Sequence, residues 1–204
     1  MKIAVFASGR GSNFEAILDA MREGLLPARV CVVISNNSGA GALETARSHN
    51  IPAFHLSQKQ FPSEDAFSDS LISLLQDHGA QFIALAGYLK KLSFPVVERY
   101  RNKITNMHPA LLPSFGGPGM YGMNVHEAVI AAGAKVSGAT VHLVDEAYDR
   151  GPIVLQKSVE VTADDDAASL AVKVLKIEHE LYPLALKAFA EGRVVFKGNK
   201  VWIR

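Results

Sequence analysis

Short apolar runs alternate with segments of helical periodicity along most of this chain, and this alternation restricts the fold more than any other feature. The runs are rich in β-branched residues, as buried strands are. Strands that alternate with helices form βαβ units, in which helices cover a buried parallel sheet. The predicted strands are residues 2–7, 30–34, 53–56, 81–86, 103–107, 139–144 and 153–159. The predicted helices between them are residues 14–21, 40–49, 64–77, 95–100 and 125–132.

The end of the chain predicts one long helix and a hairpin. Acidic residues 164–166 are expected in the first turn of the helix, where they suit the positive end of its dipole. Gly192 is expected to end the helix, and Gly198-Asn199 to turn a closing hairpin. The core-facing stripe of the helix is expected to contain Val174, Ile177, Leu181 and Leu184. The predicted fold class is therefore α/β: a Rossmann-like, doubly wound, mostly parallel sheet flanked by helices, with a small C-terminal hairpin, in one domain over residues 1–204.

Composition limits the class of protein further. Hydrophobic residues make up 49% of the 204 residues, and 21 basic against 20 acidic residues leave a formal charge of +1. Such a chain can bury a core, and its charge indicates neither a nucleic-acid nor a membrane partner. No apolar run approaches the roughly 20 residues of a membrane-spanning helix, and the start lacks the apolar stretch of a secretory signal. We therefore expect a cytoplasmic protein, whose only cysteine, Cys31, lies in the core.

The segment Ser8-Gly9-Arg10-Gly11-Ser12-Asn13 lies between the first predicted strand and helix. Backbone N–H groups and the helix dipole favour an anion there, and the glycines allow it to approach closely. Phe14 replaces the third glycine of the dinucleotide pattern, and the acid expected about 20 residues later is absent. The segment therefore indicates a site for one terminal phosphate. The alternative is a plain turn in which Ser12 or Asn13 caps the helix.

A second polar group is expected where two later strands end. Asn106 and His108 share one side of an extended segment, so an amide and an imidazole together are available to a developing oxyanion. Asp149 follows a later strand in a turn, and a carboxylate near His108 is expected to raise the pKa of the imidazole. His142 is expected to be a supporting or core residue. The alternative for each of these residues is a turn position or a satisfied hydrogen-bonding group.

Residues 113–124 contain four glycines and predict a loop that orders over a ligand, or else an ordinary surface excursion. The chain contains neither a Gly-x-Ser-x-Gly elbow nor the histidine spacing of a metal site. Polarising groups without a nucleophile suit a reaction between two bound molecules, such as acyl-type transfer.

The motifs also resemble a known family when they are read in order. They are Ala7-Ser8-Gly9-Arg10-Gly11-Ser12-Asn13, Asn106-Met107-His108-Pro109, Thr140-Val141-His142, Asp149-Arg150-Gly151-Pro152 and Glu178-His179-Glu180-Leu181-Tyr182-Pro183. Together they resemble the phosphoribosylglycinamide formyltransferases, folate-dependent enzymes of purine synthesis, over essentially the whole chain. The Asn-x-His and Asp parts are shared with methionyl-tRNA formyltransferase and formyltetrahydrofolate deformylase, whereas the first loop favours a ribonucleotide acceptor.

This resemblance implies transfer of the formyl group of 10-formyltetrahydrofolate to the amine of glycinamide ribonucleotide, without a metal. The implied catalytic residues are Asn106, His108 and Asp149, supported by His142 and Thr140. The implied ribonucleotide-binding residues are Gly11, Ser12, Asn13, Lys176 and Glu178. The implied folate-binding residues are Leu89, Lys90, Lys91, Leu92, Val97, Ile104, Asn106, Asp145, Tyr148 and Asp149. Residues 1–100 are expected to hold mainly the ribonucleotide phosphate, and residues 101–204 mainly the catalytic and folate sites.

Two departures from the family and two rival functions remain open. Glu64 stands where the family often presents a basic residue to the folate tail, and residues 116–124 resemble an insertion. Glu178 is alternatively an ordinary helix-surface acid, and Lys90 and Lys91 a solvated face. One rival function is a hydrolase that releases formate from 10-formyltetrahydrofolate; the other is a phosphoribosyl-binding module without catalysis.

Overall fold

The computed structural model describes all residues 1–204, and the chain divides into two compact units, Met1–Asn106 and Met107–Arg204. Seven strands follow the sheet order β3-β2-β1-β4-β5-β6-β7, and β8 and β9 form a separate hairpin. The strands are β1 Lys2–Phe6, β2 Arg29–Ser35, β3 Ala53–His55, β4 Phe82–Leu85, β5 Ile104–His108, β6 Val136–Leu143, β7 Ile153–Glu160, β8 Val194–Lys197 and β9 Lys200–Ile203. The helices are α1 Ser12–Arg22, α2 Gly41–Ser48, the short 3₁₀ helix η1 Gln58–Gln60, α3 Glu64–Asp77, α4 Phe94–Arg99, α5 Met123–Ala131 and α6 Ala167–Ala190. The predicted fold class is confirmed.

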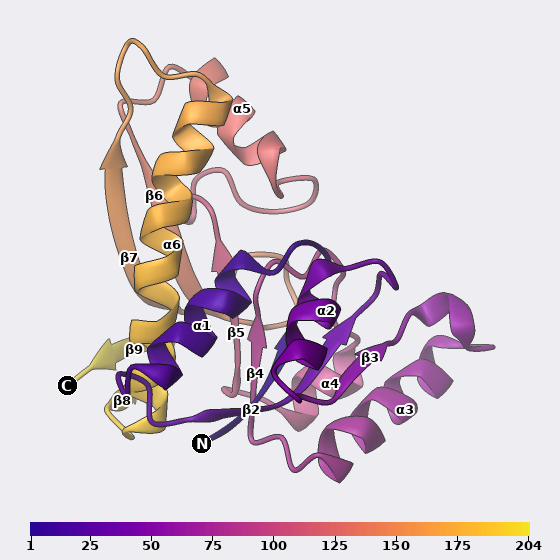
Figure 1. The fold of residues 1–204 in the computed structure, drawn as a ribbon. Helices are drawn as coiled ribbons and strands as arrows, with labels where there is room; N and C mark the ends of the chain where they lie inside the picture. The colour runs from indigo at the N-terminus through magenta and orange to yellow at the C-terminus, as the bar shows by residue number, and fades with distance from the viewer. The chain divides into compact units, whose positions relative to one another are not determined.

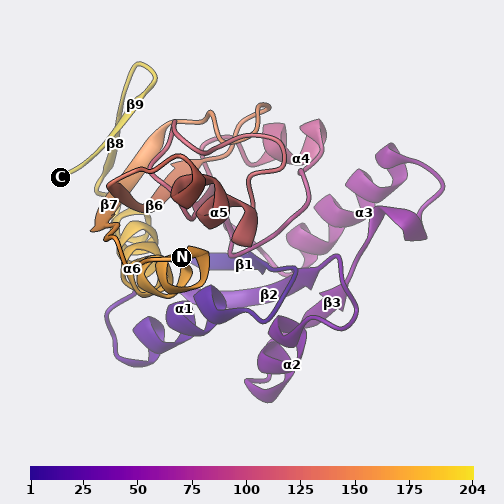
Figure 2. The same cartoon turned by 90° about the horizontal axis from the view of Figure 1, so that it is seen from above.

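The first unit is a doubly wound parallel sheet. Its strands pair in parallel from β3 to β5, and the β4 residues and all but the first residue of β1 are buried. Continuous burial explains why these strands read as unbroken apolar runs rather than alternating ones. The chain winds outward from β1 to β3 and then returns to β4. Because the crossovers are right-handed, the two directions place helices on opposite faces: α1 and α2 on one, α3 and α4 on the other (Figure 2).

The second unit packs α5 and α6 around an antiparallel strand pair. The strands β6 and β7 pair over most of their length, and α6 contacts both strands and α5 (Figure 1). Asp166 is the N-cap of α6 and forms a reciprocal capping box with Ser169. The three acids therefore precede the first turn instead of lying in it, and Asp165 accepts a hydrogen bond from Lys173 at 2.6 Å. The positive φ of Gly192 and the pairing of Lys197 with Lys200 confirm the predicted helix end and hairpin.

Two predictions about individual side chains are wrong. Leu184 is 55% exposed, while its neighbours Ala185 and Leu186 are buried. A helix advances 3.6 residues per turn, so a stripe read at spacings of three and four drifts around a helix as long as α6. Cys31 is half-buried rather than part of the core, and its thiol lies 3.4 Å from the Ile3 carbonyl oxygen.

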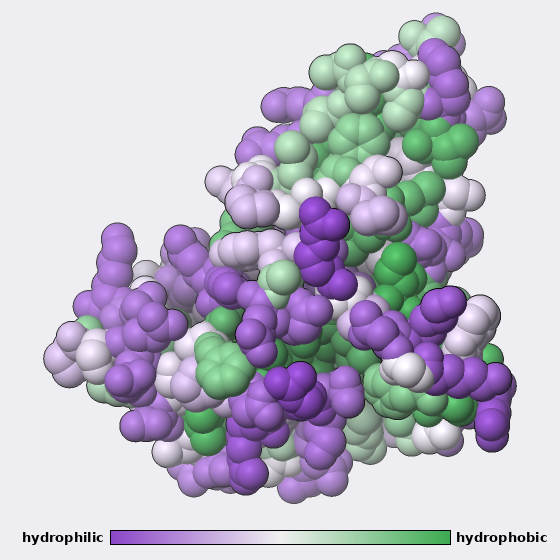
Figure 3. Space-filling model, turned by 180° about the vertical axis from the view of Figure 1, so that it is seen from behind, coloured by the Kyte–Doolittle hydropathy of each residue, from purple (hydrophilic) through white to green (hydrophobic).

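The surface mixes hydrophilic and apolar side chains, as the face drawn in Figure 3 shows. No helix combines the length and apolar composition needed to cross a bilayer. The large exposed apolar side chains include Leu89, Tyr121 and Tyr148. Leu89 and Tyr148 are predicted folate-binding residues, and Tyr121 lies in the glycine-rich loop, so these side chains are accessible to a ligand.

Candidate active site

The last residue of the loop between β1 and α1 has a backbone conformation and surroundings that only glycine suits. Gly11 has φ +91, and a Cβ there would lie 2.8 Å from the Ala42 Cβ and 3.0 Å from the Ala42 Cα. Gly11 is also the N-cap of α1, and no side chain caps this helix end. The alternative that Ser12 or Asn13 caps the helix is therefore wrong. The N-terminal end of α1, with the positive end of its dipole, remains a favourable place for an anion.

The segment after β4 combines exposed and buried members of the predicted folate site. Leu89, Lys90 and Lys91 are exposed, whereas Leu92 is only 3% exposed. Val97 on α4 and Ile104 on β5 are likewise buried, at 4% and 1% exposure. The segment therefore presents two cations and one apolar side chain to solvent and is anchored by Leu92.

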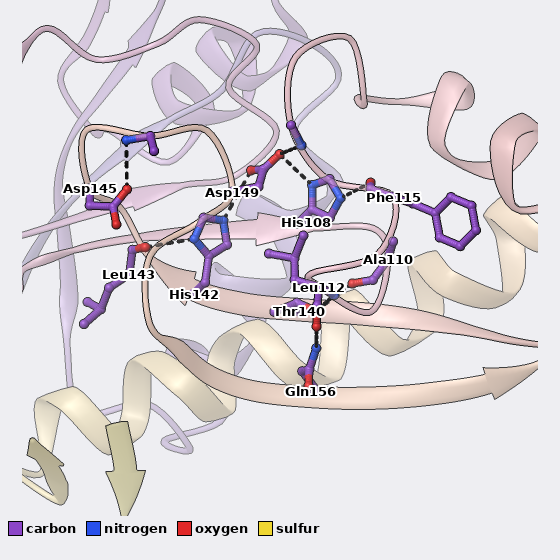
Figure 4. Close-up of polar contacts among 12 residues, drawn as sticks. His108, Ala110, Leu112, Phe115, Thr140, His142, Leu143, Asp145, Asp149 and Gln156 are labelled. Carbon is purple, nitrogen blue, oxygen red and sulfur yellow. Dashed lines mark hydrogen bonds and ion pairs between the residues drawn. The ribbon is translucent and has the colours of Figure 1, made fainter. Parts of the chain in front are cut away.

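In the second unit a carboxylate lies between two imidazoles. Asp149 Oδ2 is 3.6 Å from His108 Nδ1, and Asp149 Oδ1 is 3.5 Å from His142 Nε2 (Figure 4). The side chains are 10%, 3% and 3% exposed, respectively. The two histidines come from β5 and β6, and the carboxylate from the turn after β6, so the structure brings three distant predicted residues into one buried cluster.

The glycine-rich loop supplies two backbone groups to this cluster. The Phe115 carbonyl oxygen is 2.8 Å from His108 Nε2, and the Gly117 N–H donates to Asp149 Oδ2 at 2.9 Å. A carbonyl only accepts hydrogen bonds, so the His108 proton resides on Nε2. The 3.6 Å contact of His108 Nδ1 with Asp149 is too long for a hydrogen bond, as expected of a neutral ring whose proton is on the other nitrogen.

The electrostatics of His108 correct the sequence-based expectation. Burial lowers the pKa of His108, and the nearby charge of Asp149 and the Phe115 carbonyl, which act to raise the pKa, do not reverse the shift. Asp149 thus acts in the expected direction, but burial outweighs it, and periodicity does not reveal how deeply the ring is buried. Burial also acts to raise the pKa of Asp149, but the hydrogen bond with His142, the Gly117 N–H and both imidazoles outweigh it and lower the pKa. The cluster thus favours a neutral His108 beside an ionised Asp149.

The turn that carries Asp149 is held in a demanding conformation. Asp149 has φ +53, which side chains other than glycine rarely adopt. Two residues later, a Cβ on Gly151 would lie 1.9 Å from the Leu143 carbonyl oxygen, so the close approach requires glycine. The same Leu143 oxygen is 2.8 Å from His142 Nδ1. The glycine and the ring are therefore packed against one carbonyl group, which fixes the turn relative to His142.

Thr140 and an unpredicted residue, Gln156, anchor the base of the glycine-rich loop. The buried Thr140 hydroxyl donates to the Ala110 carbonyl at 2.6 Å and accepts from the Leu112 N–H at 3.1 Å. The Gln156 amide donates to the Leu112 carbonyl at 2.9 Å and to the Thr140 hydroxyl at 3.0 Å. Thr140 and Gln156 are cross-strand partners in β6 and β7, so pairing the two predicted strands would have been the signal for Gln156.

Other predicted residues are more dispersed. Lys176 is exposed and Glu178 buried; two positions apart on α6, they point to different faces of the helix. Asp145 accepts a hydrogen bond from the Ala147 N–H at 2.9 Å, within the turn that leads to Asp149. His126, which the sequence did not distinguish, is 5% exposed, and burial lowers its pKa.

No group of three or more His, Cys, Asp or Glu side chains in the structure is suited to hold a metal ion.

Comparison with known proteins identifies the family. Residues 1–186 match the family model described as formyl transferase. A chloroplastic phosphoribosylglycinamide formyltransferase of Vigna unguiculata is 42% identical over 98% of this chain, which spans 64% of that relative's length. The glycinamide ribonucleotide transformylase 1 of Symbiobacterium toebii superposes with a TM-score of 0.93 at 41% identity, covering 100% of this chain and 93% of that one. The chain therefore belongs to the formyl transferase family.

Within that family, the chain is similar to enzymes that carry the phosphoribosylglycinamide formyltransferase name, as the sequence motifs indicated. A formyltetrahydrofolate deformylase from Pseudomonas syringae shares the fold, with a TM-score of 0.88, but is 25% identical, and this chain covers 65% of it. The resemblance that was inferred from the sequence is confirmed, and so is the predicted enzyme class.

Proposed function

We propose that the protein transfers the formyl group of 10-formyltetrahydrofolate to the amine of glycinamide ribonucleotide in purine synthesis. The products are formylglycinamide ribonucleotide and tetrahydrofolate. The observation that carries the chemistry is the buried carboxylate of Asp149 between two imidazoles, with the His108 proton on Nε2. The family match and the similarity to phosphoribosylglycinamide formyltransferases support the choice of substrates.

In the proposed mechanism, the neutral amine attacks the formyl carbon and forms the new C–N bond. The formyl oxygen becomes an oxyanion, which accepts hydrogen bonds from the Asn106 amide and His108 Nε2. In the structure, His108 Nε2 donates its hydrogen bond to the Phe115 carbonyl. The formyl oxygen therefore replaces the Phe115 carbonyl as the acceptor when the substrate binds. A neutral imidazole can donate this bond, so a raised pKa is not required.

Proton transfer completes the reaction. The attacking amine must lose a proton, and the folate nitrogen must gain one as its bond to the formyl carbon breaks. Asp149 is ionised, is 10% exposed and contacts both imidazoles, so we assign it to the movement of this proton, with water as carrier.

The remaining predicted residues bind the substrates in this proposal. Gly11, Ser12 and Asn13 hold the ribonucleotide phosphate at the start of α1. Leu89 contacts the folate, and Lys90 or Lys91 meets its carboxylate tail. We expect the reaction to take place in the cytoplasm.

Formyl-folate consumption, followed by absorbance, tests the function. Consumption should require glycinamide ribonucleotide and should stop when the ribonucleotide is exhausted. The second candidate is formyl-folate hydrolysis, which the similarity to the deformylase structure motivates. Consumption that proceeds at the same rate without the ribonucleotide, with release of formate, would reject the transferase and support the hydrolase.

A further inference from the structure

Ser8 lies at the point in the first unit where the winding of the sheet reverses. It follows β1, whose neighbours are β2 on one side and β4 on the other. The chain leaves β1 toward β2 and later returns to β4, so the loops after β1 and β4 diverge. Ligands of open α/β sheets bind where loops diverge in this way.

Every polar group of Ser8 forms a hydrogen bond to a neighbouring segment at this position. Its backbone N–H donates to the Gly87 carbonyl at 2.9 Å, and its carbonyl accepts from the Asn37 side chain at 3.4 Å. Its hydroxyl donates to Asn36 Oδ1 at 2.5 Å and accepts from the Leu89 N–H at 2.8 Å. Ser8 is 8% exposed, so these bonds are largely shielded from water. One small residue therefore ties the first loop to the segment that follows β4.

The two tied segments are those to which the proposed function assigns different substrates. Three residues after Ser8, the chain reaches Gly11 and the start of α1, assigned to the ribonucleotide phosphate. The hydroxyl's other partner, Leu89, is the first residue of the segment assigned to the folate. Of the Ser8 contacts with that segment, the bond to the Leu89 N–H is the only one made by a side chain.

We propose that Ser8 is a positioning residue that couples the two substrate sites, so that each substrate strengthens the binding of the other. This inference rests on the proposed function. A ligand that orders one segment lowers the entropy cost of ordering the other only if the two are mechanically joined. The Ser8 hydroxyl supplies that joint between the first loop and Leu89. Since linkage is reciprocal, the ribonucleotide must raise folate affinity by the same factor as the folate raises ribonucleotide affinity.

Calorimetric titration of the protein with glycinamide ribonucleotide and tetrahydrofolate measures this factor directly, because tetrahydrofolate carries no formyl group to transfer. In the unsubstituted protein, each ligand should raise the affinity of the other by about fivefold or more, within the range usual for coupled sites. In Ser8→Ala the factor should fall below about twofold, while turnover with both substrates saturating changes little. Ser8→Thr, which keeps a hydroxyl, should restore the coupling.

Ser35→Ala is the matched control. Ser35 is fully buried at the neighbouring strand end, and its hydroxyl accepts from the Asn37 N–H at 3.1 Å without contacting the segment after β4. Its loss should lower the melting temperature but leave the coupling factor unchanged. A purely structural role for Ser8 would make the two alanine variants behave alike.

Two results would overturn the inference: independent binding of the two ligands to the unsubstituted protein, or full coupling in Ser8→Ala. Both are binding results, so they are separate from the transfer assay. If the unsubstituted protein transfers the formyl group but Ser8→Ala still couples the two ligands fully, only the role of Ser8 is rejected. A protein that couples the two ligands but makes no formylated ribonucleotide would reject the proposed function instead.

Discussion

The two units each carry a hydrogen-bonded cluster at the end of a strand, and the clusters differ in charge. Around Ser8, the partners are amide and hydroxyl groups, none of which titrates near neutral pH. Around Asp149, one ionised carboxylate lies between two imidazoles, accepts a hydrogen bond from the Gly117 N–H, and has beside it a His108 ring that donates to the Phe115 carbonyl. The first cluster is suited to hold a fixed geometry at any pH, whereas the second changes its hydrogen bonds whenever a proton moves. The comparison therefore separates positioning from chemistry.

The largest effect is expected from removing a member of the charged cluster. His108→Ala removes a donor to the oxyanion, and Asp149→Asn removes the carboxylate while keeping its size. Each should lower kcat by about 10²–10³, as loss of one oxyanion donor typically does. Calorimetry should show ribonucleotide binding nearly unchanged. Near-normal turnover in either purified variant would remove these residues from the mechanism and, with it, the contrast between the clusters.

Gly151→Ala should disturb the same cluster without removing any of its side chains. The new Cβ would meet the Leu143 carbonyl oxygen at 1.9 Å, so the turn that carries Asp149 must shift. Displacements near 1 Å are costly in catalysis, and we expect kcat to fall by about tenfold or more.

Gly133→Ala provides the control for this glycine substitution. Gly133 has φ +64 and open space around it, so the change adds backbone strain but no collision. It should leave kcat within about twofold of normal, since the strained residue lies outside the cluster. Equal losses of kcat in the two variants would show that strain, rather than displacement of Asp149, controls turnover.

Thr140→Val tests whether the uncharged hydrogen bonds of the Thr140 hydroxyl stabilise the second unit. The variant keeps the shape but leaves the Leu112 N–H without its buried partner. Urea unfolding should show a loss of about 1–3 kcal/mol in the free energy of unfolding. Thr140→Ser, which keeps the hydroxyl, should retain most of that stability. If valine is as stable as threonine, the hydroxyl does not anchor the loop.

The smallest effect is a dependence of stability on pH to which the charged cluster should contribute. The pKa of His108 in the folded protein is lowered from 6.5, so below about pH 6.5 the unfolded chain binds a proton that the folded ring does not. Unfolding is therefore favoured as pH falls, with at most about 1.4 kcal/mol lost per pH unit for one proton. The lowered pKa of Asp149 acts in the same direction, but only at more acidic pH.

Denaturant unfolding at pH 7 and pH 5.5 measures this dependence. His108→Gln should lose less stability than the unsubstituted protein across this interval, and Ser8→Ala should lose as much. An equal loss in His108→Gln would show that the acid sensitivity arises elsewhere.

The sequence predicts the first unit well because its signals are local. Buried parallel strands are apolar throughout. The predicted ends of β1 agree with the observed ends within one residue, and those of α3 are identical. Burial of single side chains is less local: the stripe that placed Leu184 in the core ignored the drift of a long helix.

The sequence predicted that His108 and Asp149 lie near each other, but it did not predict the electrostatics of their cluster. Asn106, His108 and Asp149 stand at strand ends or in turns, where chemistry is expected. The direction of the His108 pKa shift depends on burial and on contacts from the glycine-rich loop. Glycines leave many backbone conformations open, so no sequence pattern indicates that the Phe115 carbonyl meets His108 or that the Gly117 N–H meets Asp149.

The fate of the formyl carbon distinguishes transfer to the ribonucleotide from hydrolysis. The protein is incubated with formyl-folate labelled with ¹³C at the formyl carbon and with glycinamide ribonucleotide, and the products are analysed by mass spectrometry. We expect one labelled formyl group on the ribonucleotide for each folate consumed, and almost none when Asp149 is replaced by asparagine. Label recovered as free formate, or labelled ribonucleotide formed as fast by Asp149→Asn, would contradict it.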